Sequence, residues 1–355
     1  MLNLRTSCWT ILVGSILRRI AKPVGVAAIA AALTGCFNSA EPIAEIYGAT
    51  MGSTYSVKWV AAANTPKSDD IKRWLDDYLE AFESDASTWR PDSRLSRFNA
   101  APAGTCQIMP QSILDIVAVS QQLHEQTDGS FDITLDPLLQ LWGFHGDAGR
   151  QQVPDDAQVT ETVARTGHQY LHIRDNQLCK DRALELDIGG VAAGYIVDEV
   201  VEHFKAVGIQ SYMVEITGEL KADGNKPGNV PWRIALEEPR DDSRVAQLIF
   251  PLRGYGVSTS GDYRNYFEED GHRYSHTFDP VLGRPIRHDL AAVTVLHRST
   301  AMADGLSTAL LVKGEEAGWA YALEHELPAL FLIRQGDGFV SRSTPQFIAL
   351  QQGKE

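Results

Sequence analysis

Residues 258–308 carry three polar clusters, which read Ser258-Thr259-Ser260-Gly261-Asp262-Tyr263, Tyr274-Ser275-His276-Thr277-Phe278-Asp279-Pro280 and Ala303-Asp304-Gly305-Leu306-Ser307-Thr308. Each cluster contains a glycine or a proline that shapes the backbone, and each stands at the end of an apolar run. Proteins commonly build their sites in this way, with polar groups on turns that a buried scaffold holds in place. The stretch therefore predicts a scaffold of strands and helices with a polar site at its turns.

Helices and strands are mixed along the chain without regular alternation. Apolar residues at three- and four-residue spacing predict helices over Asp69–Glu83, Ser112–Thr127 and Val191–Val207, and a fourth that Ser299 or Thr300 caps. Short apolar runs predict strands at Glu45–Val60, Tyr212–Ile216, Trp232–Leu236, Ala246–Leu252 and Ala291–Leu296. This mixture predicts an α+β fold with one large catalytic unit, rather than a doubly wound sheet.

The composition narrows the classes of ligand. The chain has 355 residues, of which 44% are hydrophobic and 22% charged, and these values are ordinary for a globular protein with a large core. Its net charge of −14 argues against nonspecific binding to nucleic acid. An acidic protein that binds a phosphorylated ligand needs local positive charge at its binding site, which a bound cation can supply.

The first 46 residues resemble an export and anchoring segment. Basic residues between positions 18 and 22 precede the apolar run Val24–Leu33, which is too short to span a bilayer. The run ends in Leu33-Thr34-Gly35-Cys36, which resembles a bacterial lipobox; the alternative is an ordinary signal peptide with a chance cysteine. We expect a signal peptide over residues 1–35, a lipidated Cys36 with a short tether over 36–46, and the catalytic domain over 47–350.

Two cysteines remain after this processing. Cys8 leaves with the signal peptide and Cys36 carries lipid, so only Cys106 and Cys179 are left in the folded part. In an oxidising compartment these two can form a disulfide, or they can be two buried thiols, and the sequence does not choose.

Asp304 and Thr308 are candidate magnesium ligands. They are four residues apart at the start of a predicted helix, so both side chains lie on one face. A carboxylate and a hydroxyl are hard oxygen ligands of the kind that magnesium binds. The alternative is that Asp304 complements the helix dipole and Thr308 packs.

His276 is a candidate general base. It comes just before Asp279-Pro280, where proline removes a backbone donor and ends a strand. An imidazole there can take a proton near neutral pH. The alternative is a hydrogen-bonded core or turn histidine, since the chain contains ten histidines.

Two backbone segments are candidates for contact with a ligand. The hydroxyl-rich segment Thr259–Tyr263 predicts a turn that holds phosphate oxygens, or else a plain hairpin turn. The segment Asp187–Gly190 closes a strand and opens a helix, so its backbone groups can face a ligand. The chain contains no fingerprint of a dinucleotide-binding fold.

Together the motifs resemble one family over nearly the whole mature chain. They occur in order at residues 51–55, 91–99, 129–138, 186–195, 260–263, 276–280 and 303–308. The longest read Gly129-Ser130-Phe131-Asp132-Ile133-Thr134-Leu135-Asp136-Pro137-Leu138 and Leu186-Asp187-Ile188-Gly189-Gly190-Val191-Ala192-Ala193-Gly194-Tyr195. In these motifs the chain is similar to the FAD:protein FMN transferases, the ApbE-type flavin transferases.

The resemblance implies a fold, a reaction and a set of site residues. FAD would lie in a cleft between sheet-and-helix subregions, and the enzyme would use Mg²⁺ to move FMN from FAD onto a Thr or Ser hydroxyl of a partner protein, releasing AMP. The resemblance makes His276 the base, and Asp304 and Thr308 the magnesium ligands together with a carbonyl near Gly190. The FAD-contacting positions it implies are Met51, Trp89, Ser130, Phe131, Asp132, Asp187, Ala193 and Thr277.

Three positions depart from the family pattern. Trp89 stands where a tyrosine is common, so a stacking face is kept and a hydroxyl is lost. Ala193 replaces a lysine or glutamate, which removes a polar contact. Thr217 replaces the first glycine of a Gly-Gly-Glu, which affects close backbone approach at that point.

Two other functions remain open from the sequence. One is hydrolysis of FAD to FMN and AMP by the same scaffold, and the other is a flavin-binding lipoprotein without catalysis. For the transferase, the expected location is the bacterial cell envelope, anchored by lipid and facing the periplasm. The expected acceptor is a redox or ion-pumping membrane-complex subunit or a secreted flavoprotein; its identity, the choice of inner or outer membrane and the oligomeric state do not follow from these residues.

Overall fold

The computed structural model describes residues 42–145, 151–237, 246–263, 265–336 and 338–353, all within one compact unit. The predicted signal peptide and the predicted lipidated Cys36 lie outside these residues. The first strand, β1, begins at Ile43, so the segment predicted as a tether up to residue 46 is already part of the sheet. Across the described ranges, none of the helices combines the length and the apolar character that crossing a bilayer requires.

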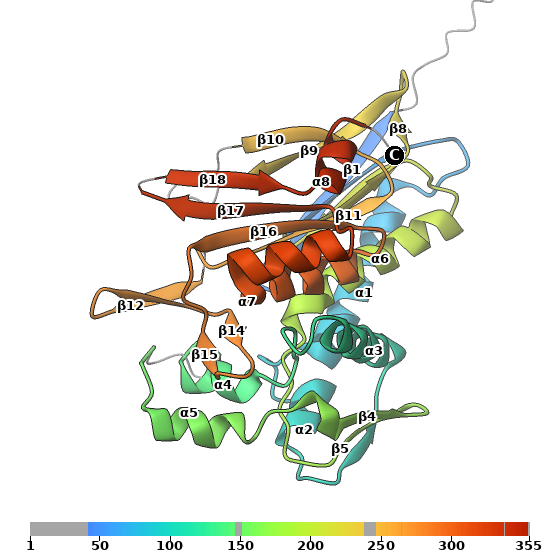
Figure 1. Ribbon diagram of the computed structural model, residues 1–355. Coiled ribbons are helices and arrows are strands. Elements are labelled where there is room, and N and C mark those ends of the chain that lie inside the picture. Colours follow the sequence, from blue (N-terminus) through green and yellow to red (C-terminus); the bar gives the residue numbers. More distant parts are fainter. Residues whose placement is uncertain (1–41, 146–150, 238–245, 264, 337, 354–355) are drawn as a thin grey trace, which may run out of the picture. The chain divides into compact units, whose positions relative to one another are not determined.

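An antiparallel sheet of eight strands forms the centre of the fold (Figure 1). Its order is β1-β2-β6-β7-β11-β16-β17-β18. The strands are β1 (Ile43–Thr50), β2 (Ser53–Val60), β6 (Tyr212–Ile216), β7 (Glu219–Asp223), β11 (Tyr255–Gly261), β16 (Leu290–His297), β17 (Ala329–Gln335) and β18 (Gly338–Ser343). β2 pairs with β6 although a long stretch of chain separates them, with Tyr55 opposite Ile216.

Three long helices pack on one face of this sheet, namely α1 (Ser68–Ala86), α6 (Gly189–Ala206) and α7 (Thr300–Glu324) (Figure 1). The central strand β16 explains why both faces are covered. Leu290, Val293 and Val295 belong to the core under the helices, whereas Ala292 and Leu296 belong to a second core on the other face. Because β16 is buried on both faces, its apolar residues follow one another instead of alternating with polar ones.

The second core lies under a smaller sheet and a short helix. The strands β8 (Asn225–Lys226), β9 (Val230–Glu237) and β10 (Ala246–Leu252) form that sheet, and α8 (Pro345–Gln351) packs beside it. Trp232, Phe250 and Phe347 fill the space between these elements and the main sheet. Because both faces of the main sheet are occupied, the functional site must lie at an edge or at an end of the strands.

Within the described residues, the remaining elements are five helical segments, a three-stranded sheet and two hairpins. The helices are α2 (Arg94–Ala100), α3 (Gln111–Gln126), α4 (Asp136–Leu141), α5 (Asp156–Val163) and the 3-10 turn η1 (His168–Tyr170). The strands form a three-stranded sheet of β3 (Cys106–Ile108), β4 (Leu171–Arg174) and β5 (Gln177–Lys180), and two hairpins, β12 (Tyr266–Glu269) with β13 (His272–Ser275) and β14 (Phe278–Asp279) with β15 (Arg284–Pro285).

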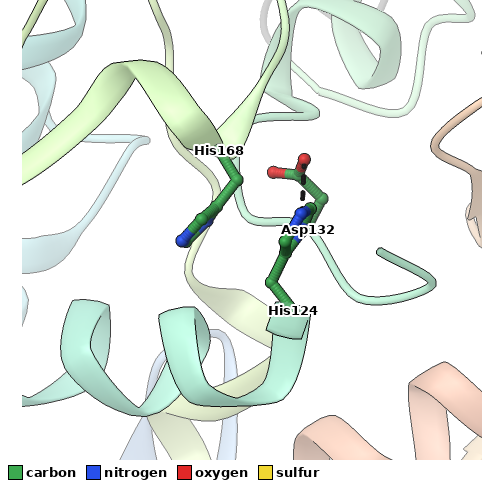
Figure 2. A group of neighbouring side chains, drawn as sticks. All are labelled: His124, Asp132 and His168. Carbon is green, nitrogen blue, oxygen red and sulfur yellow. Dashed lines mark ion pairs between the residues drawn. The ribbon is translucent and has the colours of Figure 1, made fainter. Parts of the chain in front are cut away.

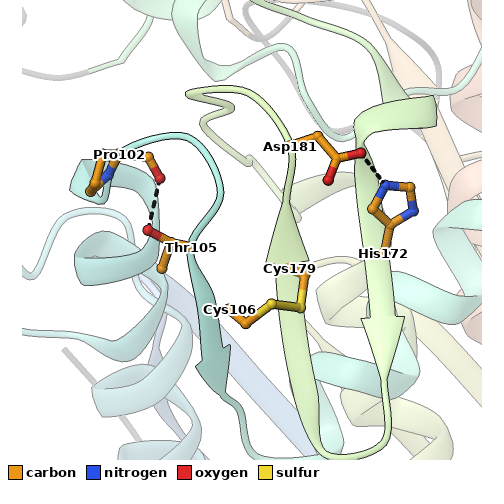
Figure 3. Close-up of a disulfide and its surroundings, with 6 residues drawn as sticks. All are labelled: Pro102, Thr105, Cys106, His172, Cys179 and Asp181. Carbon is orange, nitrogen blue, oxygen red and sulfur yellow. Dashed lines mark hydrogen bonds and ion pairs between the residues drawn. A yellow bond between two sulfur atoms is a disulfide. The ribbon is translucent and has the colours of Figure 1, made fainter.

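Cys106 and Cys179 form a disulfide between β3 and β5 (Figure 3). The two residues are direct register partners in the pair of strands. Of the two alternatives that the sequence leaves open, the structure has the disulfide and not a pair of free thiols.

The structure confirms the predicted α+β fold. The helix expected over Asp69–Glu83 is α1, and Ser299 caps α7 through a hydrogen bond from Met302 N. Two further predictions are wrong. The segment expected to be a turn over Thr259–Tyr263 is mostly strand, because β11 continues to Gly261. The hydroxyl residues that suggested a turn instead alternate along the strand, and Ser258 and Ser260 reach α7. The segment Asp187–Gly190 opens α6 as expected but closes no strand, because the last strand before it, β5, ends at Lys180.

Candidate functional site

Two cavities lie side by side at the N-terminal end of α6. The first has a volume of about 480 Å³, and β11, α7 and the segment Ser130–Asp132 contribute to its wall. The second has a volume of about 610 Å³, and Met51, Trp89 and His145 contribute to its wall. Both cavities are lined by the same five residues at their junction: Leu139, Asp187, Gly189, Asn265 and His276. A long ligand can therefore pass His276 and extend into both.

Asp304 and Thr308 project from the first turns of α7 towards β11 and α6. Ser258 Oγ donates to Asp304 Oδ1 at 3.3 Å, and Gly194 N donates to Asp304 Oδ2 at 3.2 Å. Thr308 Oγ1 is 2.8 Å from Ser260 Oγ. A Cβ atom placed on Gly190 would be 3.9 Å from Thr308 Oγ1, so the start of α6 is adjacent. The structure thus places Gly190, Asp304 and Thr308, which the family resemblance implies as magnesium ligands, on the wall of the first cavity.

Two carboxyl groups line the first cavity here, those of the buried Asp304 and the partly buried Glu219. Burial raises the pKa of Asp304 to about 7, against partial stabilisation by Gly194 and Ser258. Burial and the charge of Asp304 also raise the pKa of Glu219, whose Oε1 is 3.5 Å from Ser258 Oγ. A divalent cation would stabilise the charged forms of these two carboxyl groups. The carboxylate, hydroxyl and carbonyl oxygens also fit the ligand preference of Mg²⁺.

Glu219 lines the first cavity but is not among the site residues predicted from the sequence. Its only signal is the motif Thr217-Gly218-Glu219, whose departure from the family pattern concerns the backbone. In the structure Thr217 adopts a φ of 55° and Gly218 a φ of 115°, so they form the tight turn between β6 and β7. This turn places Glu219 at the start of β7, where it lines the first cavity. Threonine in place of glycine is therefore accommodated, in a region of φ that is strained for a β-branched residue.

His276 follows β13 and stands at the junction of the cavities. Its backbone N donates to Asn265 O at 3.1 Å, and its Nδ1 is 3.3 Å from the same oxygen, so the hairpin β12–β13 fixes the ring. The side chain is open to the cavity but surrounded by protein, and this burial lowers its pKa below the usual value. A lowered pKa keeps the imidazole neutral at pH 7, and a neutral imidazole can accept a proton.

The predicted FAD-contacting residues divide between the two cavities. Ser130, Phe131, Asp132, Asp187 and Thr277 line the first cavity, and Met51, Trp89 and Asp187 line the second. Ala193 lines neither of these two cavities; it is buried within α6, and its neighbour Ala192 faces the second cavity. The helical rotation between consecutive residues explains why only one of the two alanines reaches the cavity.

Met51 is held in place by α1. It lies in the turn between β1 and β2 with a φ of 46°, and its backbone N donates to Glu83 Oε1 at 2.8 Å. Thr50 Oγ1 donates to the same carboxylate oxygen at 3.0 Å. Glu83 therefore ties the turn to α1 and so fixes one edge of the second cavity.

Asp132 forms a cluster with His124 and His168, of a kind that can hold a metal ion (Figure 2). The rings of His124 and His168 are stacked, with centroids 4.5 Å apart and planes 15° apart. A histidine binds a metal through a nitrogen lone pair in the plane of its ring, so near-parallel stacked rings cannot aim at one ion without rotation of a ring. In addition, His124 Nδ1 is 2.9 Å from Phe131 O.

We therefore interpret this cluster as a support for the cavity wall. His124 holds the carbonyl of Phe131, while Thr134 donates from its backbone N and its Oγ1 to Asp132 Oδ1, at 2.8 and 2.7 Å. Burial, followed by the neighbouring His124, lowers the pKa of His168, which favours a neutral stacked ring. These contacts fix Phe131 beside Gly190 in the wall of the first cavity.

Comparison with known proteins gives a consistent result. A match to the ApbE family covers residues 51–331. The FAD:protein FMN transferase of Vibrio cholerae is 40% identical over 316 residues, which cover 89% of this chain and 94% of the relative. The FAD:protein FMN transferase of Escherichia coli is 34% identical over 336 residues, which cover 91% of this chain and 95% of the relative.

Solved structures agree with the sequence matches. The apo flavinyl transferase ApbE of Pseudomonas stutzeri superposes with a TM-score of 0.83 at 50% identity, covering 88% of this chain and 98% of that structure. The flavin transferase ApbE of Vibrio cholerae superposes with a TM-score of 0.80 at 39% identity, covering 86% of this chain and 98% of that structure. The family match covers residues 51–331, and the relatives are similar along most of the chain. The chain therefore belongs to the ApbE family.

Proposed function

We propose that this protein is an FAD:protein FMN transferase, which moves the FMN part of FAD onto a Thr or Ser hydroxyl of an acceptor protein. The relatives that carry this name are similar along most of both chains. The observation that carries the proposal is the position of His276. It lies in the wall that the two cavities share, and the first cavity is also lined by the oxygen-bearing side chains of Asp304, Thr308 and Glu219. FAD has a pyrophosphate between two ring systems, so its reacting centre can lie at that wall with one ring in each cavity.

The proposed reaction is a substitution at the FMN phosphorus. His276 takes the proton of the acceptor hydroxyl while the oxygen forms a new bond to phosphorus. The bond between this phosphorus and the bridging oxygen breaks, and AMP leaves with the electron pair. The products are a phosphoester that joins FMN to the acceptor, AMP, and a proton on the imidazole.

Asp304, Thr308 and a carbonyl near Gly190 would hold Mg²⁺ in this proposal. When bound, the ion supplies neutralisation of the pyrophosphate charge and of the charge that develops on the leaving AMP. The support is the chemistry of the donors and the raised pKa of Asp304 and Glu219, because the described residues around them stabilise their charged forms poorly.

We also propose that the catalytic domain works outside the cytoplasm, attached to the membrane through Cys36. The order of basic residues, apolar run and lipobox supports this location. The disulfide between Cys106 and Cys179 is compatible with it, because such bonds persist in oxidising compartments. The acceptor would then be a redox membrane-complex subunit or a secreted flavoprotein.

An acceptor assay tests the activity and separates it from hydrolysis. The protein is incubated with FAD, Mg²⁺ and a flavoprotein acceptor, and covalent flavin is read from the fluorescence of the denatured acceptor band. Covalent flavin with release of AMP is the expected result, whereas free FMN without labelled acceptor would establish hydrolysis instead. His276→Ala should lower the rate by about 10²- to 10⁴-fold. The matched control is His172→Ala, since His172 is an exposed histidine of β4 paired with Asp181 and outside both cavities.

A further inference from the structure

Trp89 presents an exposed indole to the second cavity. Trp89 is 66% exposed, whereas Trp59 and Trp142 are fully buried. An exposed indole in a cavity offers a flat apolar face for a planar ring. Such a face is useful only if the ring has a fixed orientation, because an unrestrained side chain must lose rotamer freedom when a ligand binds.

The ring of His145 supplies a contact that restrains the indole. The two ring centroids are 4.9 Å apart at an angle of 65°, which is the edge-to-face arrangement that aromatic pairs prefer. Thr88, the residue before Trp89, is bonded to the same imidazole, with Thr88 Oγ1 2.7 Å from His145 Nε2. His145 therefore contacts two consecutive residues of the segment that follows α1.

Asp136 fixes the orientation of His145. Its Oδ1 forms a short hydrogen bond with His145 Nδ1, so both ring nitrogens have a partner. Asp136 is itself 3% exposed, and its second oxygen accepts from Gln140 Nε2 at 2.7 Å. Because a buried carboxylate with both oxygens occupied has little freedom, the line Asp136–His145–Thr88 is a rigid support that runs from α4 to the edge of the cavity.

The support works in both charge states of the imidazole. Burial acts to lower the pKa of His145, but the hydrogen bond and the charge of Asp136, with a smaller effect of Asp187, outweigh it and raise the pKa. With Nδ1–H donating to Asp136 in either state, Nε2 accepts from the Thr88 hydroxyl when neutral and donates to it when protonated. A hydroxyl can take either role, so the bond to Thr88 persists across this titration.

We propose that His145, oriented by Asp136, is a positioning residue that holds Thr88 and Trp89, so that the indole stacks on one of the two planar rings of FAD. This inference rests on the proposed function for its ligand. It assigns a role to three residues, Asp136, His145 and Thr88, that do not belong to the predicted set of FAD contacts. None of the three needs to touch the reacting phosphorus, so their effect should be on the binding of FAD and not on the chemical step.

Binding and turnover of paired variants test the proposal. His145→Phe keeps an aromatic ring and removes both hydrogen bonds. Thr88→Val removes only the hydroxyl, whereas Thr88→Ser retains a hydroxyl. The matched control is His172→Phe, which breaks a histidine–aspartate pair outside both cavities. FAD affinity is measured by calorimetry in EDTA without acceptor, and kcat and KM are then measured with Mg²⁺ and acceptor.

We expect His145→Phe to weaken FAD binding about tenfold and Thr88→Val to weaken it several-fold, with kcat within about twofold of wild type. Thr88→Ser should bind within about twofold of wild type, like the control. Titrations with FMN and with AMP separately should show the loss for one half of FAD only, and that half identifies the ring that Trp89 stacks on.

Unchanged FAD affinity in His145→Phe and Thr88→Val would overturn the proposal. Equal loss for FMN and AMP would overturn it too, because it would indicate general distortion. If circular dichroism shows that His145→Phe does not fold, the comparison of Thr88→Val with Thr88→Ser decides alone. A wild-type protein that binds FAD but labels no acceptor would defeat the proposed function and leave this inference to be judged by the affinities.

Discussion

The close crossing of α6 and α7 at Gly194 predicts an unusual effect of a small substitution. A Cβ atom at this position would lie 2.5 Å from Thr300 O and 2.8 Å from Ala301 Cα, and both are backbone atoms that cannot rotate away. Ordinary contact begins at 3.4 Å, so in Gly194→Ala the two helices must separate by about 0.9 Å. The bond from Gly194 N to Asp304, now 3.2 Å long, would stretch with them.

The magnitude follows from three contributions. Alanine inside a helix is favoured over glycine by about 1 kcal/mol. Overpacking of this size costs about 1–3 kcal/mol, and a buried carboxylate that loses a donor adds about 1 kcal/mol or more. We therefore expect Gly194→Ala to lower the free energy of unfolding by about 2 kcal/mol, the opposite of the usual sign for this substitution in a helix.

The assay is urea unfolding followed by circular dichroism, with Mg²⁺-dependent protein stabilisation as a second reading. Gly338→Ala is the matched control, because a Cβ atom there meets nothing within 4 Å, and its effect should stay within about 0.5 kcal/mol. If Gly194→Ala is as stable as wild type and keeps its response to Mg²⁺, the helix crossing does not determine the geometry around Asp304, and the reasoning is refuted.

Three further predictions concern titratable side chains. Burial raises the folded-state pKa of Asp304 to about 7 from an ordinary 3.8, so without metal its contribution to stability is largest below pH 4 and is lost as the pH rises to about 7. Urea unfolding in EDTA should therefore show Asp304→Asn gaining stability relative to wild type over that range, while losing Mg²⁺-dependent transfer; a constant difference would contradict this. Because burial lowers the pKa of His276, kcat/KM should rise with pH through a value below 6.5, and an acid limb above 6.5 would count against His276 as the base. Lys180 donates to Phe98 O, Asn99 O and Leu184 O at 2.6, 3.0 and 2.8 Å, so Lys180→Met should cost about 3 kcal/mol in urea unfolding; an effect below about 1 kcal/mol, as expected for the exposed Lys205→Met, would refute this.

Local periodicity predicted the long elements well. Apolar residues at helical spacing locate α1 and α6 to within a few residues, since each buries one stripe against the sheet. The assignment failed at β11, where Ser258, Thr259 and Ser260 have the composition of a turn. These hydroxyls lie on a strand because their partners are on α7 and β16, and such tertiary contacts have no local signal.

The candidate site was predictable where its residues form compact motifs. Asp304 and Thr308 lie one helical turn apart, and the structure brings Gly190 to them. The support behind Trp89 was not predictable, because 57 residues separate Thr88 from His145 and neither carries a motif. Glu219 was missed for a similar reason, since its position beside Asp304 depends on two strands and a helix that meet only in the fold.

The pairing of β2 with β6 has a consequence for the order of folding. Tyr55 and Ile216 are register partners, so the chain must close a loop of more than one hundred residues before this pairing contributes. The pairs β6–β7, β16–β17 and β17–β18 join neighbouring segments instead. We therefore expect the strands from β6 onwards to assemble with α6 and α7 first, and the β1–β2 hairpin to dock late. A chain whose slowest contacts lie at its N-terminal strands keeps this edge of the sheet unpaired until the rest has assembled.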